Sequence, residues 1–434
     1  MLRFLFSSFL IFLFALQTTG QHFKYSDREL YLGMGKLPLV AAPGNQFHLW
    51  HIERYQTKVY EFDQELHHLD TKTFNHPVKA AFRSEFLKFH SFYYTLMSDS
   101  ASEKIYRVDS SGSIVDQTEL IQGKMALYKF RPYYFTKGSS NIFLVQKTEN
   151  ENDGNTLLSI NVFDSVFNYK DAITLTVPYI NGLPQNLQLH PEGDDLLLLN
   201  NTFQKGEVAF SITRIDASTH QLSTKVFNPE GLQFMDHKLF MAGDELILQS
   251  QVKENGTANS QEKFSYLMKL NSDLEVIQTL FVSAEELHNL ELSGYFLAPV
   301  LVASLPGKNL LSISSGIKKA GKGRGDAEIY QFLLMDSNLN IRQSYVQPAV
   351  KGRFTPSLTI LKDKSSYFFY TEESRQDANL VHKFEASATS GTDALLMLTP
   401  TYHYDLGRAV VSGPDSFVMP YYQRGKVGLV RVNL

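Results

Sequence analysis

Short stretches of the chain alternate apolar and polar residues in the manner of β-strands. Residues 104–120 read KIYRVDSSGSIVDQTEL: the alternation runs to Asp109, a Ser-Ser-Gly turn follows, and the alternation resumes. A period of two is typical of a half-buried strand, and a Gly-bearing turn between two such stretches is typical of a hairpin. We therefore expect a β-hairpin over these residues.

The same phrase recurs along the whole chain. Each copy has an aromatic or aliphatic residue, a polar residue, an aliphatic residue, and then Asp, Asn or Glu before a turn. The eight copies are Tyr60–Asp63, Tyr106–Asp109, Ile160–Asp164, Ile212–Asp216, Tyr266–Asn271, Tyr330–Asp336, Val381–Glu385 and Leu429–Asn433. Their turn residues lie 46 to 65 residues apart. A repeat of this length indicates an array of equivalent structural units.

Each copy has similar neighbours. A strand-like segment precedes it, in most copies another follows the turn, and a more variable segment ends in a Gly- or Asp-bearing turn, as at 191–194, 242–244 and 413–415. Four short strands per repeat, with almost no helical periodicity, predict a four-stranded antiparallel meander. Since a single meander has two apolar faces and two exposed edges, we expect several to pack face to face.

Over roughly residues 25–434, this repeated hairpin phrase and its period resemble the blades of secreted bacterial β-propeller repeat proteins. The resemblance is to an architecture and not to an enzyme family. It implies an all-β fold, a β-propeller of four-stranded antiparallel blades, in a single domain over residues 21–434. Eight copies favour eight blades, and seven blades with one irregular copy is the alternative. Two separate β domains are less favoured, because no Pro- or Ser-rich linker divides the chain.

The two ends of the chain predict how the ring closes. In the propellers that this chain resembles, the N-terminus commonly supplies the outermost strand of the last blade. The eighth copy stops at Leu434, where that strand would begin, and residues 28–34 (RELYLGM) offer a spare strand ahead of 37–42. We expect residues 28–34 to pair beside 426–433.

The N-terminus indicates export. Residues 1–20 combine a basic Arg3, an apolar run over 4–16 and a small-residue exit at 18–20, which is the pattern of a secretory signal peptide. The apolar run is shorter than the roughly 20 residues of a membrane span, so an uncleaved anchor is the weaker alternative. We expect an exported protein, periplasmic or extracellular, from a bacterial envelope, with no membrane span and a monomeric state.

Composition excludes several functions. The 434 residues contain no cysteine, which rules out disulfides, thiolate metal sites and cysteine catalysis. With 43% hydrophobic residues, a chain of this length can bury a large core without disulfides. A formal net charge of −4 gives no support for nucleic-acid binding, because that would require a concentrated basic excess.

The predicted connections between the second and third strand of a blade are long and charged in four copies, namely 148–155, 252–263, 316–328 and 372–379. In the architecture that the chain resembles, these connections share a face with the connections between blades, and that face usually binds. Long polar loops on a rigid framework often carry function. The alternative is that they are solvated hairpin tips.

Basic and aromatic residues cluster where the predicted inner strands begin. The residues that could bind a ligand there are Arg83, Arg131, Tyr133, Arg353, Tyr402 and Arg408. Arginine presents a planar donor fork to carboxylate or phosphate, and aromatic faces stack on sugars. An acidic glycan or a peptide carboxylate is therefore a possible ligand at the mouth of the channel. The alternative is that the aromatic residues pack between blades and the arginines pair with nearby acids.

Catalysis and metal binding have weaker support. Glu85, Asp236 and Asp405 lie near the starts of predicted inner strands and could form a glycosidase carboxylate pair, which requires about 5 to 9.5 Å between its members. His48 and His51 would lie on opposite faces of a strand, so they do not form a chelate. We expect no metal and no cofactor. The sequence favours a binding or scaffold module for a protein or glycan partner, and the alternative is a carbohydrate-active hydrolase or lyase.

Overall fold

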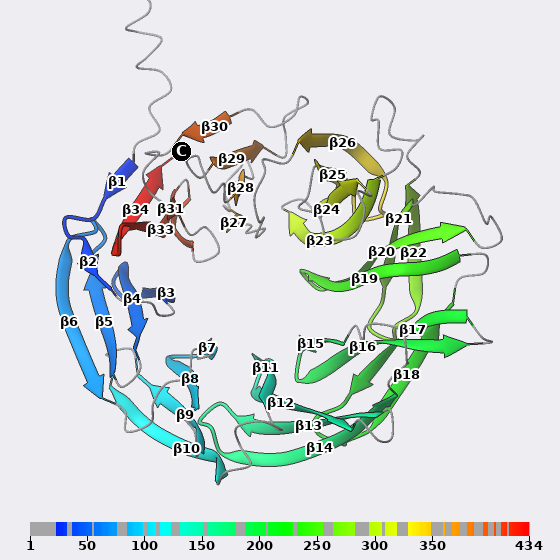
Figure 1. Ribbon diagram of the computed structural model, residues 1–434, viewed down its shortest axis with the longest axis horizontal. Coiled ribbons are helices and arrows are strands. Elements are labelled where there is room, and N and C mark those ends of the chain that lie inside the picture. Colours follow the sequence, from blue (N-terminus) through cyan, green and yellow to red (C-terminus); the bar gives the residue numbers. More distant parts are fainter. Residues whose placement is uncertain are drawn as a thin grey trace, which may run out of the picture. The chain divides into compact units, whose positions relative to one another are not determined.

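The computed structural model describes residues 23–32, 37–53, 56–75, 85–98, 102–109, 113–122, 131–150, 155–178, 187–204, 207–228, 232–254, 264–282, 295–305, 309–318, 329–348, 359–360, 367–372, 380–385, 394–397, 403–404, 409–414 and 416–433. In these residues the regular structure is β-strand (Figure 1). None of them belongs to a helix that could cross a membrane. They fall into two compact units, unit 1 with residues 1–53, 57–73 and 355–434, and unit 2 with residues 54–56 and 74–354.

Unit 2 contains five four-stranded antiparallel sheets, each a meander of consecutive strands. The strands are β7 (Glu85–Phe89), β8 (Phe92–Ser98), β9 (Ser102–Val108), β10 (Ile114–Gln122), β11 (Arg131–Lys137), β12 (Asn141–Asn150), β13 (Asn155–Asp164), β14 (Tyr169–Pro178), β15 (Gln188–Glu192), β16 (Asp195–Gln204), β17 (Glu207–Ile215), β18 (Leu222–Phe227), β19 (Leu232–Ala242), β20 (Glu245–Glu254), β21 (Phe264–Leu270), β22 (Val276–Val282), β23 (Tyr295–Leu305), β24 (Asn309–Lys318), β25 (Ile329–Met335) and β26 (Ile341–Pro348). The first strands β7, β11, β15, β19 and β23 contact one another in this order and lie on the concave side of the unit (Figure 1).

Unit 1 contains three sheets. Two are four-stranded meanders with strands β3 (Leu39–Ala42), β4 (Gln46–Ile52), β5 (Gln56–Phe62), β6 (His68–Asn75), and β27 (Thr359–Ile360), β28 (Tyr367–Glu372), β29 (Leu380–Glu385), β30 (Ala394–Met397). The third has six strands, β1 (Phe23–Tyr25), β2 (Leu30–Tyr31), β31 (His403–Tyr404), β32 (Val410–Gly413), β33 (Ser416–Gln423) and β34 (Lys426–Asn433).

The eight sheets match the eight sequence repeats. The first seven copies of the phrase lie on β5, β9, β13, β17, β21, β25 and β29, which are the third strands of their sheets, and the eighth lies on β34. The hairpin expected over 104–120 is confirmed as β9 and β10. Within the described residues, seven four-stranded sheets and one joint sheet are consistent with the predicted eight blades.

The predicted pairing of the N-terminal segment with the last repeat is confirmed and extends further than expected. Leu30 pairs with Val427 in β34, as predicted, and an earlier strand, β1, also joins β34 with Tyr25 opposite Val430. Between the two pieces, the Ser26 N–H donates to the Leu429 carbonyl at 2.8 Å, and the Ser26 Oγ accepts from the Leu429 N–H at 3.1 Å. A serine side chain thus continues the ladder where the backbone departs from it.

Hydrophobic side chains fill much of the space between neighbouring sheets of unit 2. In β20, Leu246 and Leu248 face sheet β15–β18, whereas Ile247 between them faces sheet β23–β26. Because both faces are covered, the second and third strands become nearly continuous apolar runs. All seven residues of β25, IYQFLLM, are buried. This explains why the repeated phrase combines strong hydrophobicity with only partial alternation.

The Asp or Asn that ends the phrase builds the turn after it. Among the turns that the structure describes in full, four share one form, and they begin at Asp63, Asp164, Asn271 and Asp336. In each, the side-chain oxygen accepts the backbone N–H four residues later, at 2.7 to 3.0 Å. The residue three positions after the turn residue is Leu66, Phe167, Leu274 or Leu339, with φ between 59° and 68°.

These left-handed residues are large, although left-handed backbone favours glycine. All four are at most 4% exposed and pack into the hydrophobic clusters. Burying a Leu or Phe side chain contributes about 1.5–3 kcal/mol, which offsets the strain of the backbone. We refer to this feature as the plugged turn.

Candidate functional site

The two ends of each sheet in unit 2, taken along the direction of its strands, have different chemistry. In sheet β19–β22, Leu232 at the start of β19 pairs with Glu254 at the end of β20, and Val252 pairs with Phe264 at the start of β21. The start of the first strand, the end of the second and the start of the third therefore lie at the same end of the sheet, which we call the loop edge. The opposite edge carries the tight hairpins and the plugged turns, and we call it the turn edge.

Four of the predicted site residues lie on first strands of unit 2. Glu85 and Arg131 are the first residues of β7 and β11, paired with Leu96 and Lys147, so they lie at the loop edge. Tyr133 lies at a β-bulge of β11, and Asp236 follows a bulge of β19 and pairs with Gln251. For these four, the described structure covers the backbone and not the side chains.

The other predicted residues, Arg83, Arg353, Tyr402, Asp405 and Arg408, lie outside the described residues, as do 151–154, 255–263, 319–328 and 373–379 of the four long connections. The binding and catalytic assignments of all nine residues stay predictions. The backbone does show that the starts of the first strands and the second-to-third connections share an edge in unit 2, as the predicted binding face requires.

The carboxylate pair Glu85 and Asp236 gains no support from the topology. The two residues lie on β7 and β19, and the first strands β11 and β15 come between them. Packed sheets are about 10 Å apart, whereas the carboxylates of a glycosidase are about 5 to 9.5 Å apart. Two first strands therefore separate these residues, and their pairing stays a prediction.

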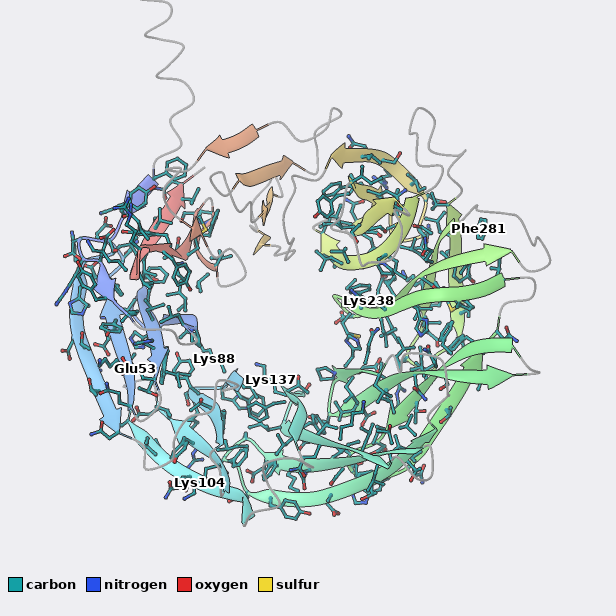
Figure 2. All side chains as sticks on the ribbon, viewed as in Figure 1. Glu53, Lys88, Lys104, Lys137, Lys238 and Phe281 are labelled. Atoms are coloured by element: carbon teal, nitrogen blue, oxygen red, sulfur yellow. The ribbon has the colours of Figure 1, made fainter. Side chains whose placement is uncertain are left out.

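Three lysines of the first strands face the concave side of unit 2, namely Lys88 on β7, Lys137 on β11 and Lys238 on β19 (Figure 2). The Lys137 Nζ lies 5.4 Å from the centre of the Phe89 ring on the neighbouring sheet, which is a cation–π distance. Sequence analysis did not single out these lysines, because the Arg-aromatic clusters at the strand starts dominated the pattern.

Charge on the first strands is partly neutralised within the framework. Glu192 on β15 forms an ion pair with Arg214 on β17, so this acid is already engaged. His190, also on β15, has a pKa below its ordinary value because burial disfavours its charged form. Among the described side chains of these strands, the lysines thus present the positive charge that a negatively charged ligand would meet.

Sequence analysis also missed a buried histidine, His237 on β19. It is 3% exposed and lies against aromatic rings, with its ring centre 5.2 Å from that of Phe210. Burial lowers the pKa of His237 to about 4, so the imidazole stays neutral at physiological pH. Its inward position depends on the bulge between Phe234 and Asp236, which changes the alternation of β19 and gives no clear sequence signal.

The backbone around His237 is held by a glutamine of the preceding sheet. Gln188 on β15 donates from Nε2 to the His237 carbonyl at 2.9 Å and accepts the Leu239 N–H with Oε1 at 3.0 Å. One side-chain amide thus pairs with the edge of β19 as a peptide group would, and it ties two neighbouring first strands together.

In unit 1, His48 and His51 contact different carboxylates. The His48 Nε2 lies 3.7 Å from Glu61, and the His51 Nδ1 lies 3.0 Å from Glu53. Within the described parts of the chain, no three His, Asp or Glu side chains come together as metal ligands.

Comparisons with known proteins identify the fold and no family. No protein-family model matches the sequence, and no curated protein matches it. The Dos1 propeller is similar over 95% of this chain and 96% of its own, at 11% identity and a TM-score of 0.51. The polysaccharide lyase Uly1 covers 83% of this chain and 92% of its own, at 11% identity and a TM-score of 0.46. The β-propeller domain of the Trilobed protease from Pyrococcus furiosus covers 85% and 97%, at 10% identity and a TM-score of 0.40.

The likeness to the Dos1 propeller, together with the sheet topology, shows that the fold is a β-propeller of four-stranded antiparallel blades. The predicted all-β propeller fold is confirmed. At 11% identity, this likeness concerns the fold alone.

Proposed function

We propose that the chain is an exported binding or scaffold module that engages a protein or glycan partner at the loop edge and the concave side of its blades. The observation that carries the proposal is the difference between the two edges of unit 2. The turn edge is closed by short hairpins and plugged turns, whose polar groups are engaged in local hydrogen bonds. The loop edge gathers the strand starts and the long connections, which the repeat does not constrain.

The lysines of the concave side favour a partner with negative charge. Lys88, Lys137 and Lys238 come from three different sheets, so a ligand that contacts all of them must span several blades. An extended acidic glycan meets this requirement, and so does an acidic protein surface. We choose the acidic glycan, because repeated carboxylates along one chain match cations spaced from blade to blade.

A glycan array with acidic and neutral glycans tests this function. The protein is expected to retain acidic glycans, and the double substitution Lys137→Glu with Lys238→Glu is expected to reduce binding at least tenfold. Binding should also weaken as salt rises, because exposed charges are screened. The matched control is Lys225→Glu on β18, an outermost strand, which should leave binding unchanged.

The outcome also separates binding from catalysis. Release of shortened or unsaturated products from a retained glycan would favour the hydrolase or lyase alternative. Binding that ignores the double substitution, or that prefers neutral glycans, would contradict the proposed ligand class.

Export is part of the same proposal and rests on residues 1–20. A secretory signal cleaved before Gln21 predicts that the protein recovered from a bacterial periplasm or medium begins at that residue. Intact-mass measurement of the secreted chain checks this, and recovery of the full-length chain in the cytoplasm would contradict it.

A further inference from the structure

The packing between sheets β19–β22 and β23–β26 changes character along its length. Towards the turn edge it is apolar, with Ile247 and Leu267 packed in one cluster with Leu310 and Leu333. Between this apolar part and the apolar residues Leu297 and Ile329 near the loop edge lie six polar side chains, and we call this group the polar seam. It consists of Gln249 and Gln251 on β20, Ser265 on β21, Ser312 and Ser314 on β24, and Gln331 on β25, each at most 2% exposed.

Two hydrogen bonds cross the polar seam. The Gln249 Nε2 donates to the Ser314 Oγ at 2.7 Å, and the Ser265 Oγ donates to the Gln331 Oε1 at 3.4 Å, which is long. Five buried atoms have no partner among the described residues, namely the Gln249 Oε1, the Gln251 Oε1 and Nε2, the Ser312 Oγ and the Gln331 Nε2. Exchanging the oxygen and nitrogen of any of these amides leaves the number of unpaired atoms unchanged, since each amide presents both.

The chemistry of these five atoms defines what could satisfy them. Two are acceptors, two are donors, and a hydroxyl can be either. A metal ion would face the amide donors, and an anion would face the amide acceptors, so neither fits. A small neutral molecule that donates and accepts at once fits all five, and water is the smallest. Buried polar groups without protein partners are typically hydrogen-bonded to ordered water.

We propose that the polar seam is an internal hydration site in which about two water molecules bridge the two sheets, since each buried water makes 2 to 4 hydrogen bonds. At its inner end the seam reaches the first strand β19. Lys238 pairs with Gln249 across β19 and β20, and the Lys238 side chain is partly exposed on the concave side. The water thus belongs to the fold of unit 2.

The substitution Gln251→Met tests the proposal in the full chain. In a hydrated seam, methionine displaces water and leaves the Gln331 and Ser312 atoms without partners, so Tm should fall by about 2 °C. In a dry seam, methionine removes two unpaired polar atoms at nearly constant volume, so Tm should rise. The control Gln278→Met changes an exposed glutamine of β22 and should not move Tm.

A second measurement keeps the test independent of stability. Magnetic relaxation dispersion of water ¹⁷O counts long-lived internal waters, and the count should be lower for Gln251→Met than for the original chain or for Gln278→Met. A Tm that rises or stays level, or an internal-water count that the substitution does not change, would overturn the proposal.

Discussion

The two faces of sheet β19–β22 can be compared position by position. One face meets sheet β15–β18 in what we call the aromatic seam, and the other forms the polar seam with sheet β23–β26. Phe210 and Ser265 each lie six residues before their turn residue, and Tyr266 and Gln331 each lie five residues before theirs. The same positions of the repeat thus carry two aromatic residues in one seam, and a serine and a glutamine in the next.

The comparison indicates that the hydrogen bonds between strands determine the meander topology of the sheets, whichever side chains pack between neighbouring sheets. Both seams join sheets with the same meander topology, although one is filled by rings and the other by amides and hydroxyls. In the aromatic seam, Phe210 stacks on Phe227 at 5.0 Å and meets Phe234 edge-on at 4.8 Å. Ring pairs of this kind add about 0.5–1.5 kcal/mol beyond the burial of their area. The seams are therefore expected to differ in stability and in their response to pH.

Substitution at the equivalent position should give the largest contrast. Phe210→Ala is expected to reduce the free energy of unfolding by about 3–5 kcal/mol, because it opens a cavity under three aromatic neighbours. Ser265→Ala is expected to cost less than about 1 kcal/mol, because the hydrogen bond from the Ser265 hydroxyl to Gln331 is long and Gln331 can bond to water instead. Urea unfolding of both variants measures the difference, and equal losses would contradict the assignment of stability to the aromatic seam.

The buried histidine makes the aromatic seam sensitive to acid, whereas the six side chains of the polar seam do not titrate. His237 has a pKa of about 4 in the folded chain and about 6.5 when unfolded, so the unfolded chain binds more protons between these values. Stability is then complete above pH 6.5 and declines as pH falls towards 4, by roughly 3 kcal/mol.

His237→Phe is the matched variant for this effect. It should flatten the slope of stability against pH between 6.5 and 4, while substitution of the half-buried His190 should change the slope less. Thermal unfolding at several pH values measures the slope. An unchanged slope in His237→Phe would show that another group governs the acid response.

Much of the fold could be predicted from the sequence, because each repeat carries its own local instructions. Asp63, Asp164 and Asp336 mark the end of a third strand and supply the acceptor that builds the following turn. The extra strand near the N-terminus could also be predicted, because comparison of the repeats shows that the last one lacks an outermost strand. Its earlier half, at Phe23–Tyr25, was missed because the Ser26 side chain bridges a break that alternation alone does not show.

The sequence predicted where in the fold the candidate site lies, but not which side chains are buried there. Sequence spacing places Glu85 and Arg131 at the starts of first strands, and register confirms that these starts lie at the loop edge. The polar seam could not be found, because Gln249 and Gln251 look like ordinary polar positions of an alternating strand. Only the packing of a second sheet against them shows that they are buried.

The smallest expected contrast lies in the plugged turns at the turn edge, where Leu274 closes the aromatic seam and Leu339 closes the apolar end beside the polar seam. The first turn is built by Asn271, which does not ionise, and the second by Asp336, whose pKa is lowered chiefly by the hydrogen bond from the Asn340 side chain. A carboxylate with a lowered pKa stabilises the turn above its ordinary pKa, and the contribution is lost as pH falls through the lowered value.

We therefore expect the chemical shift of the Asn340 backbone amide to change below pH 4, where its acceptor, the Asp336 carboxylate, gains a proton. Amide chemical shifts followed by NMR from pH 7 to 2 measure both turns in one sample. Asp336→Asn should remove the titration at Asn340 and leave the turn in place, because an amide oxygen accepts the same N–H. If the chemical shift of the Asn340 amide still changed with pH in that variant, the acid response of this turn would have to come from a group other than the Asp336 side chain.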